Sequence, residues 1–237
     1  MKFTTAITNI EGGKEIIRGY ALSELVQKNS FVETIFLLLK GILPNEKEAR
    51  MMNALLTAAI DHGPGTASAL TARVSASAKN NVHTAVAAGI LGMGERHGMA
   101  IEGAAKFFEN HATTSDIEVL IKELKQKKVR VPGYGHAILE HDERADNVLM
   151  VARELGFYGQ YATFAEAFGQ KLNALSSKKV PLNIDGAMAA VFLDMGFPVD
   201  TMAGLFIISR VPGLVAQVIE EKTNDEGLRR LSEDEIE

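Results

Sequence analysis

Residues 180–196 read VPLNIDGAMAAVFLDMG, and the acidic residue Asp185 stands directly before a long apolar run. The run predicts a helix, which places Asp185 near the N-terminus of that helix. One interpretation is a plain N-cap. The other is a carboxylate that the helix dipole keeps ionised and that acts as a base, made stronger by partial burial. The segment leaves both interpretations open.

Helical patterns dominate on either side of this segment. Asn45 and Glu48 form a capping pattern before a helix. Ser115 and Glu118 predict a similar start. Aromatic and leucine side chains recur every three or four residues along a further helix, at Tyr161, Phe164, Phe168, Leu172 and Leu175.

Other local signals complete this outline. Asp200 is a candidate cap for a helix that Pro212 should end or kink. Small residues in 80–105 favour close contact between helices. Residues 4–20 contain the turn signal EGG between two short strand patterns, which predicts a hairpin. We therefore predict an all-α fold with a small N-terminal β-hairpin.

Composition limits the classes of function. The chain has 237 residues, 46% hydrophobic and 23% charged, which are globular values that allow one large domain or two lobes. Its net charge of −5 argues against a nucleic-acid surface. With no cysteine, thiol catalysis and disulfides are excluded, and a cytoplasmic setting fits. The opening residues show no secretory signal, and the apolar run at 31–44 is too short to span a bilayer, so we expect no membrane partner.

Three of the six histidines lie in glycine-rich segments. His62 is in DHGPG, His97 is in GERHG and His136 is in PGYGH. Function concentrates on such loops, and Gly133 and Gly135 would let a ligand approach the backbone closely. We expect His83, His111 and His141 to be structural or surface residues.

Three arginines are candidate clamps for carboxylates: Arg144, Arg210 and Arg230. Arg210 follows the apolar stretch FIIS, so its charge is predicted to be buried and to need a partner. Surface salt bridges are the alternative for the other two. The sequence has no HxxxH metal spacing, no GxSxG elbow and no Walker A loop, and we expect no metal. Several histidines, one aspartate and several arginines together suit acid–base chemistry on a substrate with several carboxylate groups.

Five segments then occur in a recognisable order: DHGPG, GERHG, VPGYGHAILEHDERAD, VPLNIDGAMAAVFLDMG and SRVPGLVAQVIEE. With the N-terminal ITNIEGGKEIIRGYALSEL, they resemble the citrate synthase superfamily across nearly the whole chain. The resemblance is strongest to short citryl-CoA lyases and to the C-terminal module of ATP-citrate lyase. Full-length synthases carry a long helical insert between the LP turn and the DHG segment, which is missing between Pro44 and Asp61.

The resemblance implies a fold of two helical lobes, a large one formed by residues 1–98 and 186–237 and a small one formed by 99–185. It implies catalytic roles for His97 at the thioester carbonyl, His136 at the citryl hydroxyl and Asp185 in proton transfer. His62, Arg144, Arg210 and Arg230 match groups that bind the dicarboxylate. The coenzyme A site corresponds to Val131, Pro132, Gly133, Tyr134, Gly135, Lys179 and Asn183.

The function implied is cleavage of citryl-CoA to acetyl-CoA and oxaloacetate. A citrate or 2-methylcitrate synthase is the alternative, because the same residues serve both directions. A third hypothesis is a non-catalytic subunit in a lyase complex. Since the arginine matching Arg230 reaches into the partner's site in synthases, a homodimer or larger oligomer is expected, with a citryl-CoA synthetase as a possible further partner.

Overall fold

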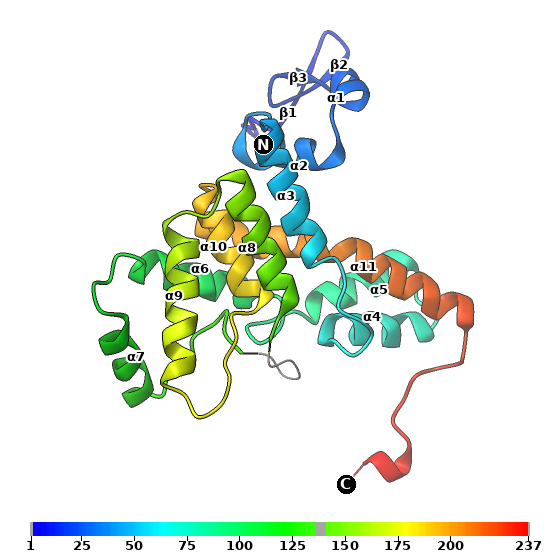
Figure 1. Ribbon diagram of the computed structural model, residues 1–237. Coiled ribbons are helices and arrows are strands. Elements are labelled where there is room, and N and C mark those ends of the chain that lie inside the picture. Colours follow the sequence, from blue (N-terminus) through cyan, green and yellow to red (C-terminus); the bar gives the residue numbers. More distant parts are fainter. Residues whose placement is uncertain (1, 136–140, 237) are drawn as a thin grey trace. The chain divides into compact units, whose positions relative to one another are not determined.

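The computed structural model describes residues 2–135 and 141–236 (Figure 1). The chain divides into two compact units, residues 1–54 and residues 55–237, which we call the N-terminal and C-terminal units. Each is described by itself. The two-lobe division at residues 98 and 185 remains a prediction.

The N-terminal unit holds a three-stranded antiparallel sheet formed by β1 (Thr8–Glu11), β2 (Lys14–Ile17) and β3 (Tyr20–Ala21). Gly12 and Gly13, both with positive φ, close the turn between β1 and β2. The predicted hairpin is therefore confirmed, and the short third strand was missed. The helices α1 (Leu22–Lys28) and α2 (Phe31–Lys40) follow.

Helix α3 (Glu46–Ala58) begins in the N-terminal unit and ends in the C-terminal unit. Its predicted capping box is present. The amide of Asn45 donates to Glu48 at 2.8 Å, and the amide of Glu48 donates to the Asn45 side chain at 3.0 Å. The reciprocal pair satisfies two donors that the first turn would otherwise leave open.

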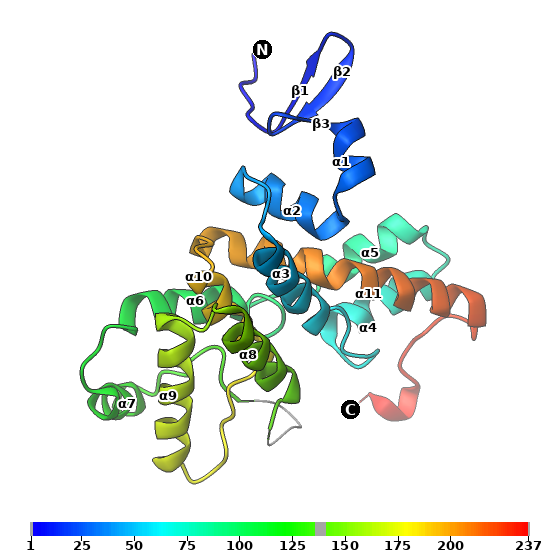
Figure 2. The same ribbon diagram turned by 45° about the horizontal axis from the view of Figure 1, so that its top comes forward.

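The C-terminal unit is helical (Figure 2). In chain order it contains α4 (Ala67–Ser77), α5 (Val82–Leu91), α6 (Ala100–His111), α7 (Ile117–Gln126), α8 (Glu143–Leu155), α9 (Gln160–Ala174), α10 (Ile184–Asp194), η1 (Val199–Thr201), α11 (Met202–Asn224) and η2 (Glu233–Glu235). The all-α prediction is confirmed.

Helix α10 forms the centre of this unit, where it packs against α6, α8 and α9. Its residues from Gly186 to Leu193 are all buried. A helix surrounded on every side needs apolar residues on every side, which explains the continuous run in the sequence. The central position fixes Asp185, in the first turn, against the body of the unit.

Small residues bring α4, α5 and α11 together, as the sequence predicted. A Cβ atom added to Gly89 would lie 2.9 Å from the Ser68 carbonyl oxygen and 3.0 Å from the Ala72 Cβ. Ala69, Ala72, Ala76, Ala85, Val86, Leu214 and Val218 form the shared core. The close approach of α4 to α5 places Ser68 beside the turn that follows α5.

Two predictions about helix ends are wrong, and of a third, at Pro212, the helix end is wrong while the kink stays a prediction. Asp116, not Ser115, caps α7 by accepting from the amides of Glu118 and Val119, since its side chain reaches both. Asp200 lies inside η1 and caps nothing. Helix α11 does not end at Pro212 but continues to Asn224, and residues on both sides of the proline are buried, which offsets a cost of about 3 kcal/mol for proline inside a helix.

Among the described residues, segment 199–224 is long and apolar enough to cross a bilayer by length and composition alone. The same test is passed by core helices of soluble proteins, and α11 buries the charged side chains of Arg210 and Glu221. The expectation of no membrane partner remains a prediction.

Candidate active site

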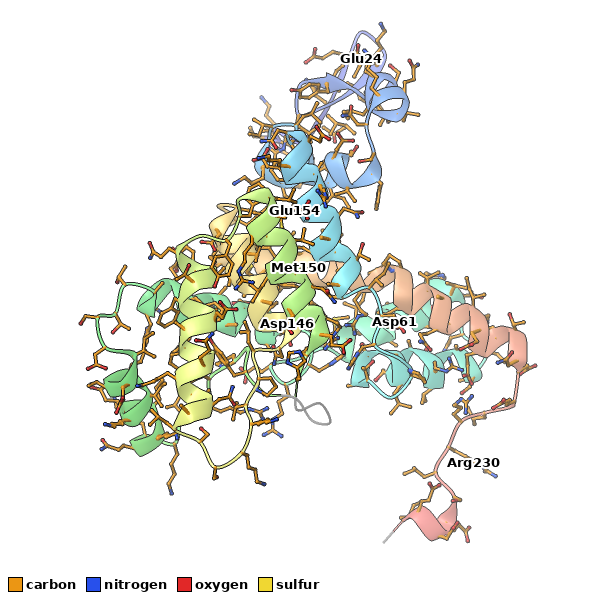
Figure 3. All side chains as sticks on the ribbon, viewed as in Figure 1. Glu24, Asp61, Asp146, Met150, Glu154 and Arg230 are labelled. Atoms are coloured by element: carbon orange, nitrogen blue, oxygen red, sulfur yellow. The ribbon has the colours of Figure 1, made fainter. Side chains whose placement is uncertain are left out.

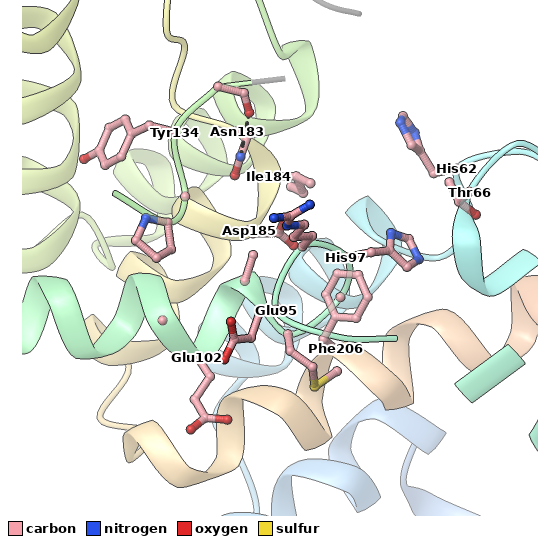
Figure 4. Close-up of a pocket in the computed structure, with 18 of the residues that line it drawn as sticks. His62, Thr66, Glu95, His97, Glu102, Tyr134, Asn183, Ile184, Asp185 and Phe206 are labelled. Carbon is pink, nitrogen blue, oxygen red and sulfur yellow. Dashed lines mark hydrogen bonds between the residues drawn. The ribbon is translucent and has the colours of Figure 1, made fainter. Parts of the chain in front are cut away.

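A cavity of about 930 Å³ opens within the C-terminal unit (Figure 4). Its walls come from the loop before α4, the turn before α6, the loop 130–135, the first turns of α8 and α10, and the middle of α11. Eleven of the predicted site residues line it: His62, His97, Val131, Pro132, Gly133, Tyr134, Gly135, Arg144, Asn183, Asp185 and Arg210.

His97 is presented by a tight turn after α5. Gly94 and His97 exchange backbone hydrogen bonds of 2.8 Å, and Gly98 follows with φ +82°. The ring Nε2 of His97 lies 2.8 Å from the Oγ of the buried Ser68. Burial lowers the pKa of His97, and the positive charge of Arg210 lowers it further. His97 is therefore neutral at neutral pH, and its Nδ1 has no hydrogen-bond partner among the described residues.

Asp185 lies in the first turn of α10 and is not the cap. That position belongs to Asn183, whose side chain accepts from the Gly186 amide at 3.1 Å. Burial raises the pKa of Asp185 from 3.8 to about 6, against the opposing effects of Arg144 and Arg210. Burial thus outweighs the two arginine charges, and Asp185 can both hold and release a proton near neutral pH.

Arg210 is a buried cation, 3% exposed, inside α11 and not at the end of an apolar helix as predicted. Its Nε donates to the Ala59 carbonyl at 2.7 Å, and its guanidinium lies 5.0 Å from the centre of the Phe206 ring. Its buried Nη1 has no hydrogen-bond partner among the described residues. A buried cation in this state favours an anionic ligand.

Arg144 is held by neighbours on two sides. Asp142 accepts from its Nε at 2.9 Å and from its Nη2 at 2.8 Å. Its Nη1 lies 3.1 Å from the Nδ1 of His62. The three side chains form a fixed group at the cavity wall, and the sequence analysis missed Asp142, although its place just before a helix was a capping signal.

The loop Val131–Gly135 is built directly on the start of α10. The Asn183 amide donates to the Gly133 carbonyl at 3.0 Å, and the Asn183 side chain donates to the Gly135 carbonyl at 2.8 Å. A Cβ on Gly133, whose φ is +84°, would lie 2.8 Å from the Gly186 Cα. Glycine is required there both for the backbone angle and for this close approach.

The Tyr134 side chain points into the protein. Its ring packs on Phe108 and Phe168, and its hydroxyl donates to the Ala165 carbonyl at 2.8 Å. Burial raises the pKa of Tyr134 well above its usual value. The tyrosine therefore anchors the loop whose backbone lines the cavity.

Three predicted site residues are not brought to this cavity. Lys179 is exposed and does not line it. Arg230 is exposed on the tail after α11 (Figure 3) and likewise does not line it. His136 lies outside the described residues. Their roles remain predictions.

The cavity also contains charged residues that the sequence analysis did not single out. These are Glu95, Arg96, Glu102, Lys106 and Arg130, and the uncharged Ser68, which contacts His97 and does not line the cavity, was also missed. No sequence pattern distinguishes these residues from surface charges. Their place at the cavity depends on how α5, α6 and the loop 130–135 meet in space.

Comparisons with known proteins agree with this geometry. The family model of the citrate synthase C-terminal domain matches residues 1–51 and 44–231. Citryl-CoA lyase from Hydrogenobacter thermophilus is 42% identical with a TM-score of 0.91, covering 99% of this chain and 93% of that one. The chain also matches 43% of ATP citrate lyase from Methanothrix soehngenii, solved with citrate and coenzyme A, at 25% identity and a TM-score of 0.86 over its whole length.

Among curated proteins, citrate synthase 2 of Bacillus subtilis is 28% identical over 83% of this chain. The chain spans about half the length of that relative, since the match covers 54% of it. The family model covers nearly the entire sequence, and the chain belongs to the citrate synthase family.

Proposed function

We propose that this protein is a citryl-CoA lyase that cleaves citryl-CoA to acetyl-CoA and oxaloacetate. One observation carries the proposal. A carboxyl group with a pKa of about 6, a neutral imidazole and a buried guanidinium with an open donor line one cavity, as Asp185, His97 and Arg210. The 42% identity to a citryl-CoA lyase of nearly the same length supports it.

The cleavage needs one proton removed and one delivered. The resemblance assigns His136 to accept the proton of the citryl hydroxyl, which becomes the ketone of oxaloacetate as the carbon–carbon bond breaks. The bonding electrons pass to the thioester as an enolate. Asp185 then delivers its proton to the enolate carbon and so completes acetyl-CoA. Its raised pKa provides this acid near neutral pH.

His97 would act on the enolate oxygen. A neutral imidazole can donate one hydrogen bond, and Ser68 fixes the ring by its contact to Nε2. A donor aimed at the atom where charge develops contributes about 3 kcal/mol to the transition state. Burial and the nearby Arg210 keep His97 neutral, and the neutral ring still carries one N–H for this role.

The carboxylates of the substrate would be bound by Arg210, Arg144 and His62. Arg210 offers the open buried donor, while Arg144 has two of its nitrogens engaged by Asp142. We therefore assign the principal carboxylate contact to Arg210. The coenzyme would follow the backbone of residues 131–135, with Lys179 nearby and with Asn183 supporting the loop.

We also propose that the active unit is a homodimer or larger. Arg230 makes no hydrogen bond or ion pair with the described residues of its own chain, and the apolar side chains Leu228, Leu231 and Ile236 of the same tail are exposed. A second copy would cover these side chains and receive Arg230. A citryl-CoA synthetase as supplier of substrate and a cytoplasmic setting complete the proposal.

The condensation direction, giving citrate or 2-methylcitrate, is the second candidate. At a pKa of about 6, Asp185 is mostly ionised at pH 7.5 and can also act as the base that condensation requires. Two assays separate the candidates. Purified protein with citryl-CoA should release oxaloacetate, whereas rapid release of free CoA from acetyl-CoA plus oxaloacetate would favour the synthase. No turnover in either assay would leave the non-catalytic subunit as the better account.

A further inference from the structure

Two carboxylates meet the start of α10, and they have different surroundings. Asp185 lies in the first turn, and its side chain makes no hydrogen bond with the described residues. Asp142, only 1% exposed, accepts four hydrogen bonds. Three come from Arg144, through its amide at 3.2 Å, Nε at 2.9 Å and Nη2 at 2.8 Å, and one comes from the Ile184 amide at 3.0 Å.

Donors of this kind favour an ionised carboxylate, and here Asp142 engages them. The Ile184 amide is the first N–H of α10, which no carbonyl of the helix accepts, and it lies where the helix dipole favours negative charge. Arg144 carries a charge that favours the ionised form of Asp185. Asn183 already occupies the Gly186 amide. Asp142 therefore occupies the first amide of the helix and two nitrogens of the guanidinium.

We propose that Asp142 is a positioning residue that favours the protonated form of Asp185 by engaging Arg144 and the first amide of α10. The inference rests on the proposed function, because it explains why one of two neighbouring carboxyl groups serves as the acid. Asp142 touches no substrate in this account. It acts through Arg144 and through the helix that carries Asp185.

The charges around Asp185 agree with this division. Arg144 and Arg210 favour its ionised form, and Asp142 opposes it, while His97 and His62 line the same cavity. Burial alone would raise the pKa of Asp142, but the hydrogen bonds from Arg144 and Ile184 hold that pKa below its usual value. The two environments thus keep Asp142 ionised and allow Asp185 to carry a proton. Differences of this kind commonly decide which of two carboxyl groups acts as the acid.

The test is the pH dependence of kcat for citryl-CoA cleavage in Asp142→Asn. Cleavage needs protonated Asp185, so kcat falls as pH rises through the pKa of that group. Asp142→Asn keeps the side-chain shape, removes the opposing charge and releases Arg144, so the fall should move to lower pH by about one unit. At pH 7.5 that shift lowers kcat about tenfold.

Arg144→Gln supplies the opposite change. It removes a cation that favours ionised Asp185, so the fall in kcat should move to higher pH, measured at saturating substrate. This variant also carries the test if Asp142→Asn does not fold. Asp194→Asn is the matched control, because Asp194 lies at the other end of α10 and its partners among the described residues are backbone amides of the α9 region. Its profile should stay at the wild-type pH.

A second readout does not depend on turnover. The difference in unfolding free energy between Asp185→Asn and its parent changes with pH as Asp185 titrates. The pH at which this difference reaches half of its full value should therefore be lower when both proteins also carry Asp142→Asn. Unshifted kcat profiles and an unshifted stability midpoint would overturn the inference. Failure of the wild-type protein to cleave citryl-CoA would instead count against the proposed function and leave the stability readout to decide about Asp142.

Discussion

The raised pKa of Asp185 predicts that its replacement by asparagine stabilises the protein while abolishing cleavage. Folding moves this pKa from 3.8 to about 6. Because the folded value is the higher one, the ionised carboxylate destabilises the folded state at any pH above the unfolded pKa. A pKa shift of about 2 units corresponds to a destabilisation of about 3 kcal/mol. This destabilisation is absent at pH values below the unfolded pKa and reaches its full size above a pH of about 6.

The assay is urea unfolding of wild type and Asp185→Asn at pH 7.5, 5 and 3.5, at a fixed protein concentration because association would change apparent stability. Asparagine preserves the shape without the charge, so we expect a gain of about 3 kcal/mol at pH 7.5. The gain should shrink to about half at pH 5 and vanish at pH 3.5. The buried carboxyl group that serves as proton donor therefore lowers the free energy of unfolding at neutral pH.

Asp194→Asn supplies the contrast on the same helix. The Asp194 carboxylate accepts from the amides of Gly159, Tyr161 and Ala162 at 2.9–3.0 Å. An amide side chain cannot accept all three, so this variant should lose about 1–3 kcal/mol. Equal or lower stability of Asp185→Asn at pH 7.5, or a gain that does not depend on pH, would refute the reasoning.

Three further perturbations test other parts of the site. Arg210→Lys should raise the KM for citryl-CoA at least tenfold, because an ammonium group cannot reproduce the guanidinium fork, and unchanged steady-state kinetics would contradict the assignment. Ser68→Ala should lower kcat with little change in KM, since it releases the His97 ring; a change in KM alone would assign Ser68 to binding. Mixing inactive Arg230→Gln with inactive Asp185→Asn should restore about a quarter of wild-type activity if the arginine acts across a dimer, and no recovery after subunit exchange would oppose that arrangement.

Local patterns were enough to predict most helices. The continuous apolar run after Asp185 predicted the buried helix α10, and the Asn45–Glu48 pair predicted the start of α3. Both depend on neighbours within a few residues. The helix end expected at Pro212 does not occur, because burial of α11 on both sides of the proline outweighs the local tendency of proline to end a helix.

The residues of the site could be predicted from the sequence, but their hydrogen bonds and protonation states could not. Glycine-rich turns and the family resemblance pointed to His97, Asp185 and Arg210, and all three line the cavity. The bonds of Asp142 to Arg144 and Ile184 depend on how α8 meets α10, which no local pattern encodes. For the same reason the sequence could not distinguish the acid Asp185 from its permanently ionised neighbour.

The most direct test of the account is a single-turnover reaction of the purified protein with citryl-CoA in deuterated water. If Asp185 delivers the proton to the enolate carbon, wild type should release oxaloacetate together with acetyl-CoA carrying one deuterium in its methyl group. Asp185→Asn should bind the thioester and release neither product at a comparable rate. Oxaloacetate release by Asp185→Asn at the wild-type rate would contradict the central assignment.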